Sequence, residues 1–204
     1  MSKRGDAFSN PITGEHGAVR LGTEDTPDKR VVSDLRVNPG GAVIGAHVHP
    51  SIDERFTVVS GKIGYRLDGK EGVAKAGDVL DIERGKIHDG WNAGDTEARV
   101  IVEIMPAERF ELMISTLFGL ANDGKTNNKG VPNPLQMAVI AQEFSDIIQF
   151  MSPPPVIQKV LFAILAPVGR RMGYQAIYER YANWDIETVE LDPLPEHLQY
   201  LDRV

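Results

Sequence analysis

Residues 41–61 read GAVIGAHVHPSIDERFTVVSG, and residues 77–92 read GDVLDIERGKIHDGWN. The first block contains His47, His49 and Glu54, and the second contains His88. Three imidazoles and one carboxylate form a complete set of ligands for a divalent transition metal. These four residues are therefore the first candidates for a functional site.

The spacing of the first block places its ligands on one face of the chain. Side chains of a strand alternate between two faces, so His47 and His49 project to the same side. Glu54 opens the following strand, from which its carboxylate can return to the same interior. Phe56 shares the face of Glu54 and would give an ion a dry, apolar floor, while His88 would add a ligand from a later strand.

Short β-type runs separated by turns extend from Arg30 to Pro106. One such run, from Ala42 to His49, holds the first two histidines. Period-two alternation continues on both sides of residues 60–62 and predicts a hairpin there, and residues 68–72 predict a second hairpin. Many short strands with turns between them indicate a sandwich or small barrel.

Helical patterns begin only after Pro106. An apolar stripe over residues 110–117 predicts a first helix that closes at Gly119. Asn133-Pro134 predicts the capped start of a second helix, whose apolar face includes residues 140, 144, 147, 148 and 151. A third, apolar helix is expected from residue 155 to about residue 173. The chain is thus divided into an N-terminal arm with one strand (1–29), a β barrel (30–106) and a helical extension with a tail (107–204).

Composition excludes several classes of function. The chain has no cysteine, which rules out disulfides, thiolate metal sites and cysteine nucleophiles. The formal net charge is −7 and no run is rich in Lys or Arg, which argues against a nucleic-acid partner. Without an apolar leader after the first basic residues, we expect a cytoplasmic protein.

The apolar run from residue 156 to residue 168 is too short and too interrupted for the roughly 20 residues of a membrane span. Packing over the barrel mouth or against a partner subunit is the favoured role for this helix. Binding to a membrane surface, with Arg170 and Arg171 toward the lipid, is the alternative, which the acidic chain argues against.

The two His-containing blocks closely resemble the signature motifs of the cupin superfamily. One position departs from the pattern, because Glu83 stands where the second motif usually has a proline. The resemblance implies a mainly β fold, in which a jelly-roll cupin barrel is followed by a C-terminal helical region. It also implies a divalent ion (Fe, Mn, Ni, Co or Zn) bound by His47, His49, Glu54 and His88, and a homodimer.

A site of this kind leaves coordination positions open, as catalytic metal sites do. The resemblance favours a metal-dependent oxidoreductase of dioxygenase type that acts on a small organic molecule in the barrel, with Glu54 as a proton acceptor. We expect Phe56 and Tyr65 to contact the substrate, with core packing as the alternative for Tyr65. A metal-dependent isomerase or lyase, a non-enzymatic ligand-binding protein and a barrel without metal remain open.

Overall fold

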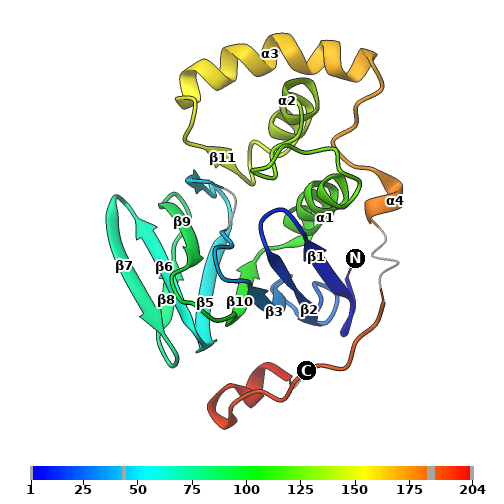
Figure 1. Cartoon of the computed structure of the whole chain (residues 1–204). Helices are drawn as coiled ribbons and strands as arrows, with labels where there is room; N and C mark the ends of the chain where they lie inside the picture. Colours follow the sequence, from blue (N-terminus) through cyan, green and yellow to red (C-terminus); the bar gives the residue numbers. More distant parts are fainter. Residues whose placement is uncertain (1, 43–44, 183–186, 203–204) are drawn as a thin grey trace.

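Two antiparallel β-sheets make up most of the first half of the protein (Figure 1). The computed structural model describes residues 2–42, 45–182 and 187–202. The larger sheet has the strand order β1 (Ala7–Asn10), β2 (Glu15–Leu21), β3 (Val31–Val37), β10 (Ala98–Met105), β5 (Asp53–Ser60) and β8 (Val79–Ile82). The smaller sheet has the order β11 (Gln149–Phe150), β4 (His47–Val48), β9 (Ile87–Asn92), β6 (Lys62–Leu67) and β7 (Lys70–Lys75).

The helices follow β10 in the chain, and only the short strand β11 lies among them. This order confirms the predicted fold class of a mainly β jelly roll with a helical C-terminal region. The helices are α1 (Glu108–Asn122), α2 (Pro134–Glu143), α3 (Pro155–Arg171), α4 (Glu179–Ala182) and the 3₁₀ helix η1 (Glu196–Asp202). The main core combines residues of both sheets, such as Val58, Val100 and Ile63, with Met113 and Leu117 of α1. The inward faces of the sheets and the apolar stripe of α1 therefore enclose one interior.

The predicted hairpin at residues 60–62 is wrong. β5 pairs with β10 and β8 in the larger sheet, whereas β6 pairs with β7 and β9 in the smaller one. The chain crosses between sheets at Gly61, whose φ is +78° and whose backbone packs so closely on Ala98 that a Cβ would lie 2.7 Å from the Ala98 Cα. The second predicted hairpin is confirmed, since β6 and β7 pair across Asp68-Gly69, both with positive φ.

The second predicted helix is shorter than its apolar pattern suggests. Asn133 caps α2 as expected, because its side chain accepts hydrogen bonds from the backbone N–H groups of Leu135 and Gln136. The helix ends at Glu143, and Gln149–Phe150 then form β11, which pairs with β4. Residues 147 and 148 are buried as predicted, but they lie in the connection between α2 and β11, next to the strand of His47.

The N-terminal arm contains two strands, β1 and β2, where the sequence predicts one. They form a hairpin that continues the larger sheet through pairing of β2 with β3. The predicted run from Ala42 to His49 includes residues 43 and 44, which lie outside the described residues. Its described part consists of β4 and a bridge from Ala42 to Trp91.

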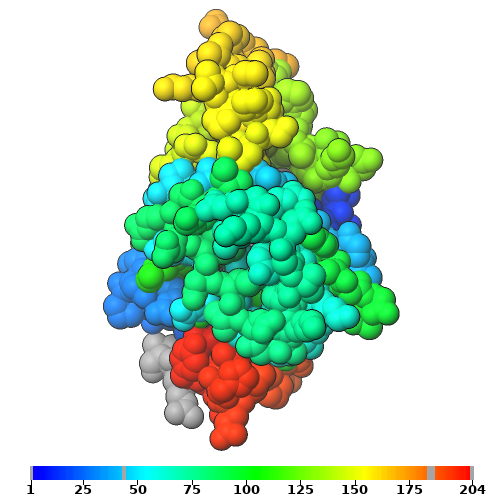
Figure 2. All heavy atoms as spheres, turned by 90° about the vertical axis from the view of Figure 1, so that its left-hand side faces the viewer, coloured from blue at the N-terminus to red at the C-terminus, as the bar shows by residue number. Residues whose placement is uncertain are grey.

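Helix α3 does not cover the barrel mouth. It packs on α2, where Gly169 lies close to Leu135 and Val139, and it forms the end of the molecule opposite the C-terminal segment (Figure 2). Its other face leaves large apolar side chains exposed, namely Val156, Ile157, Val160, Leu161, Ile164 and Val168. Within the described residues, no helix combines the length and the apolarity needed to cross a bilayer.

Candidate metal centre

His47, His49, Glu54 and His88 converge between the two sheets. One side-chain donor atom from each lies within 4.8 Å of the others, and all four residues are buried. His47 lies on β4, and His49 directly follows the end of that strand. His88 lies on β9 and pairs with His47 across the two strands. Glu54 comes from β5 of the other sheet. The structure therefore brings together the four residues that the sequence analysis grouped as candidate ligands.

Each imidazole is oriented by a backbone carbonyl. The Nδ1 atoms of His47, His49 and His88 lie 2.8, 2.6 and 3.1 Å from the carbonyl oxygens of Gly45, Ile147 and Lys86. An imidazole that donates from Nδ1 keeps a lone pair on Nε2, as metal-binding histidines do. The Nε2 atoms of His47 and His49 are 3.1 Å apart and face the common centre.

Glu54 completes the cluster. Its Oε1 lies 3.4 Å from His49 Nε2, and its Oε2 lies 2.9 Å from His88 Nε2. Despite this proximity, Glu54 Oε2 and His88 Nε2 are buried without hydrogen-bond geometry to any residue that the structure describes. Buried polar atoms without partners are rare and call for a ligand or ion. The donor set therefore fits a divalent transition metal.

The environment favours the metal-binding protonation states of His47, His49 and Glu54. Burial lowers the pKa of His47 to about 4, and neighbouring His88 and His49 contribute in the same direction. Burial also lowers the pKa of His49. For Glu54, burial alone would raise the pKa, but the adjacent histidines, His88 first, outweigh it and hold the pKa below its ordinary value. For His88, burial alone would lower the pKa, but the adjacent Glu54 outweighs it and raises the pKa. Metal binding at His88 therefore competes with its proton, because neutral imidazoles and a carboxylate are the forms that bind metals.

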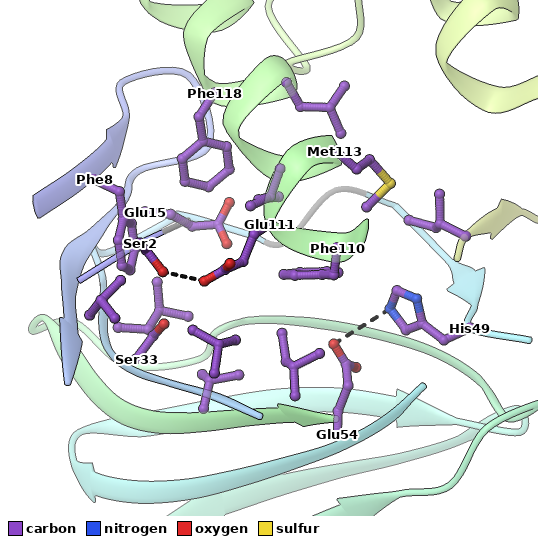
Figure 3. A pocket seen from close by; sticks show the side chains of 18 of the residues that line it. Ser2, Phe8, Glu15, Ser33, His49, Glu54, Phe110, Glu111, Met113 and Phe118 are labelled. Atoms are coloured by element: carbon purple, nitrogen blue, oxygen red, sulfur yellow. Dashed lines mark hydrogen bonds and ion pairs between the residues drawn. The ribbon is translucent and has the colours of Figure 1, made fainter. Parts of the chain in front are cut away.

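A cavity of about 130 Å³ extends from this cluster through the interior (Figure 3). Its walls are mostly apolar and include Phe56 of β5 and Phe110 of α1, whose ring centroid lies 6.1 Å from that of His49. Helix α1 lines one side of the cavity with residues 110, 111, 113, 114, 117 and 118. Helix α1, rather than α3, therefore encloses the site.

The two predicted substrate contacts share one cavity and differ in the other. Phe56 lines the main cavity next to Glu54. Tyr65 lines a smaller cavity of about 60 Å³, which also reaches Glu54 and His88, and its ring lies against Gly72 of the neighbouring strand. Phe56 therefore borders both cavities, and Tyr65 borders the smaller one.

Two cavity residues escaped the sequence analysis. Glu15 of β2 and Glu111 of α1 line the end of the cavity remote from His49 and Glu54 (Figure 3). Burial raises the pKa of both carboxyl groups, and that of Glu15 reaches about 7. Neither residue belongs to a short motif. Glu111 interrupts the apolar stripe of a helix, which is the one signal that could have indicated a buried acid.

The raised pKa of Glu15 makes a pH-dependent contribution to stability. A carboxyl group whose pKa is higher in the folded state favours folding when protonated and opposes it when ionised, so its penalty grows from about pH 4.5 to about pH 7 and persists above. We expect Glu15→Gln to leave the free energy of unfolding unchanged near pH 4 and to raise it by about 3 kcal/mol near pH 9. Urea denaturation at both pH values measures the difference.

The matched control is Glu24→Gln, because Glu24 is exposed. Its effect on the free energy of unfolding should be the same at both pH values. An equal effect of Glu15→Gln at acid and alkaline pH would contradict a raised pKa at this position.

Comparisons with known proteins match the segment of the chain that contains the four candidate ligands. Residues 33–104 match the family model described as "Cupin domain". The tetracenomycin polyketide synthase protein TcmJ of Streptomyces glaucescens is 31% identical over 101 residues, which are 49% of this chain and 60% of that protein. The match thus spans less than two thirds of that relative.

Two solved structures are similar over about half of the chain. An uncharacterised conserved protein with a double-stranded β-helix domain from Klebsiella pneumoniae is 28% identical, with a TM-score of 0.41, covering 49% of this chain and 82% of that one. A predicted oxalate decarboxylase from Thermotoga maritima is 24% identical, with a TM-score of 0.43, covering 52% and 88%.

Proposed function

Because residues 33–104 belong to the cupin superfamily, we propose that this protein is a metal-dependent enzyme that acts on a small organic molecule in the cavity between the sheets. The observation that carries the proposal is the convergence of His47, His49, Glu54 and His88 at the wall of that cavity. Buried donors with unsatisfied atoms, next to an apolar space, are typical of a catalytic rather than a structural metal site.

Each part of the site has a role in this proposal. A divalent ion of Fe, Mn, Ni, Co or Zn held by the four residues would supply Lewis acidity. Glu54 is placed to accept a proton from a substrate group that enters the cavity. Phe56 and Phe110 keep water away from the reacting groups, and Tyr65 contacts substrate from the smaller cavity. The carbonyls of Gly45 and Ile147 hold the imidazoles of His47 and His49 in place.

The reaction that we propose is a dioxygenation, in which both atoms of O₂ enter the organic substrate and the substrate supplies the electrons. The protein loaded in turn with Fe(II), Mn(II), Co(II), Ni(II) and Zn(II) is expected to consume O₂ with at least one member of a panel of flavonols, catechols and β-diketones. An oxygen electrode and mass spectrometry of products made under ¹⁸O₂ measure this. If no combination consumes O₂, the dioxygenase assignment fails.

A metal-dependent isomerase or lyase is the second candidate. The relative named above is a protein of a polyketide synthase, and a carbonyl-rich substrate of that kind suits proton transfer by Glu54 without any redox step. This reaction would proceed under nitrogen and with Zn(II), whereas the dioxygenation would stop. Comparison of turnover with and without O₂ therefore separates the two, and a protein without turnover in either would be a ligand-binding cupin.

We also propose that the protein is a cytoplasmic homodimer without nucleic-acid partners. The acidic net charge of −7 supports the exclusion of nucleic acid. The homodimer is inferred from the family resemblance. Size-exclusion chromatography with light scattering should give twice the mass of one chain, and a mass equal to one chain would refute the dimer.

A further inference from the structure

The cavity has a polar end that the metal centre does not use. Glu15 and Glu111 line it at the end remote from Glu54 and His49, among apolar side chains such as Phe8, which also line it (Figure 3). Polar groups are rare in such a lining, and they set the orientation of a bound ligand.

The two carboxyl groups differ in what they already bind. Glu111 is satisfied on both oxygens, because the Ser2 hydroxyl donates to Oε1 and the Thr23 hydroxyl donates to Oε2. Glu15 accepts one hydrogen bond, from the Thr13 hydroxyl to Oε2 at 2.7 Å. Its Oε1 has no hydrogen-bond partner among the residues that the structure describes.

Glu15 as a whole is largely withdrawn from solvent. Glu15 is 8% exposed, and it lines the cavity itself. A polar atom that lines an apolar cavity without a protein partner can form a hydrogen bond with a ligand that carries a complementary polar group. The raised pKa of the carboxyl group agrees with this setting, because the protonated form both donates and accepts hydrogen bonds.

The size of the cavity limits the ligand. Its volume is about 130 Å³. An engineered apolar cavity of about 150 Å³ in another protein binds benzene. The space between the metal centre and Glu15 therefore suits a compound with one ring and short substituents better than a fused polycyclic molecule.

We propose that Glu15 is a specificity-determining residue that binds a hydroxyl or carbonyl group at the end of the substrate remote from the metal centre. The substrate class is a single-ring compound with a polar group at each end. This inference rests on the proposed function, since it assumes that the cavity is the substrate site. Glu111, with Ser2 and Thr23, borders the same end, and its oxygens are already occupied.

Three matched pairs of probes test the proposal by binding alone. Each pair presents a phenol at one end and, at the other, either a hydroxyl or the methyl group of similar size. The pairs are hydroquinone and p-cresol, 4-hydroxybenzyl alcohol and 4-ethylphenol, and tyrosol and 4-propylphenol, which carry the terminal group progressively farther from the ring. Isothermal titration of the Zn(II)-loaded protein gives the dissociation constants.

The wild-type protein is expected to bind the hydroxyl member of at least one pair about 10-fold more tightly than its methyl partner. Glu15→Leu should abolish or reverse this preference, whereas Glu15→Gln should retain it, because an amide also donates and accepts. Glu24→Leu, at an exposed position, is the control and should behave as the wild type.

Equal affinities within all three pairs for the wild type would overturn the proposal, as would a preference that survives Glu15→Leu. Failure of all six probes to bind would overturn the single-ring class. The comparison of hydroxyl and methyl probes on the wild-type protein tests the proposal even if the Glu15→Leu variant does not fold. Oxygen uptake is not a readout, so a binding preference without any turnover would count against the proposed function and not against the role of Glu15.

Discussion

Glu54→Gln is expected to weaken divalent metal binding by about 100-fold or more, since even residues that only orient metal ligands contribute 10- to 100-fold. Glutamine has nearly the same shape as glutamate, so the cavity and the fold should remain. The substitution removes the negative charge of the carboxylate, whose Oε2 lies 2.9 Å from His88 Nε2 and whose Oε1 lies 3.4 Å from His49 Nε2. A neutral amide oxygen is a much weaker ligand for Fe(II), Mn(II) or Zn(II) than a carboxylate.

Asp53→Asn provides the matched control one residue away. Asp53 lies on the same strand, but its side chain pairs with Arg84 at the surface. Calorimetric titration with Mn(II), Co(II) and Zn(II) should give wild-type affinity for this variant. If Glu54→Gln also binds metal as the wild type does, Glu54 is not a ligand.

Thermal unfolding supplies a second readout of the same prediction. A metal that binds only the folded state stabilises it by about 2.7 kcal/mol at a free concentration 100 times its dissociation constant. Addition of Zn(II) should therefore raise the melting temperature of the wild type and of Asp53→Asn. At the same concentration it should have little effect on Glu54→Gln.

The metal cluster could be predicted from sequence because it depends on local rules. His47 and His49 share a face by strand parity, and Glu54 and His88 fall at fixed positions in two short blocks. The pairing of His47 with His88 across β4 and β9 then brings the blocks together. Only this last step depends on residues far apart in the chain, and for it the family resemblance supplied the expectation.

The surroundings of the cluster could not be predicted in the same way. The Ile147 carbonyl reaches His49 only because α2 ends at Glu143 and the chain turns back to form β11. The apolar pattern of residues 140–151 is equally consistent with one long helix, which is why the prediction extended it. Burial was therefore predicted correctly where backbone conformation was not.

The alternation of side chains along a strand also does not indicate which sheet that strand joins. Alternation continues on both sides of Gly61, and it fits a hairpin as well as a crossing between two sheets. Likewise, the apolar sequence of α3 indicated packing over the barrel mouth or against a partner subunit. Helix α1, which follows β10 directly, lines the cavity instead. An acidic residue in an N-terminal strand, such as Glu15, is expected at the surface from the sequence alone. The structure shows that it is buried.

Asp34→Ala is expected to lower the free energy of unfolding by about 3 kcal/mol or more, because it leaves a buried charge without its main partner. Asp34 accepts hydrogen bonds from the Nε atoms of Arg20 and Arg99, at 3.1 and 2.9 Å. The Arg20 side chain is 1% exposed. Its remaining charged partner would be Asp202, 2.9 Å from Arg20 Nη1.

The loss should depend on pH in a defined direction. Burial alone would raise the pKa of Asp34, but Arg99 and Arg20 outweigh it and hold the pKa below its ordinary value of 3.8. A depressed pKa contributes stability above the unfolded-state value, which is lost as the pH falls through the folded-state value. The difference between the wild type and Asp34→Ala should thus be full at neutral pH and shrink below about pH 4.

The same substitution should loosen the C-terminal segment, because Arg20 also donates to the backbone carbonyl of Asp192 and pairs with Asp202 of η1. Urea denaturation measures the stability, and limited proteolysis measures cleavage within residues 192–202. Asp81→Ala is the control, since its pair with Arg55 is exposed and such pairs contribute less than about 1 kcal/mol. Equal losses of stability for the two variants would mean that the buried network around Arg20 contributes no more than an exposed pair. Unchanged cleavage within residues 192–202 would mean that this network does not hold the C-terminal segment against the sheet.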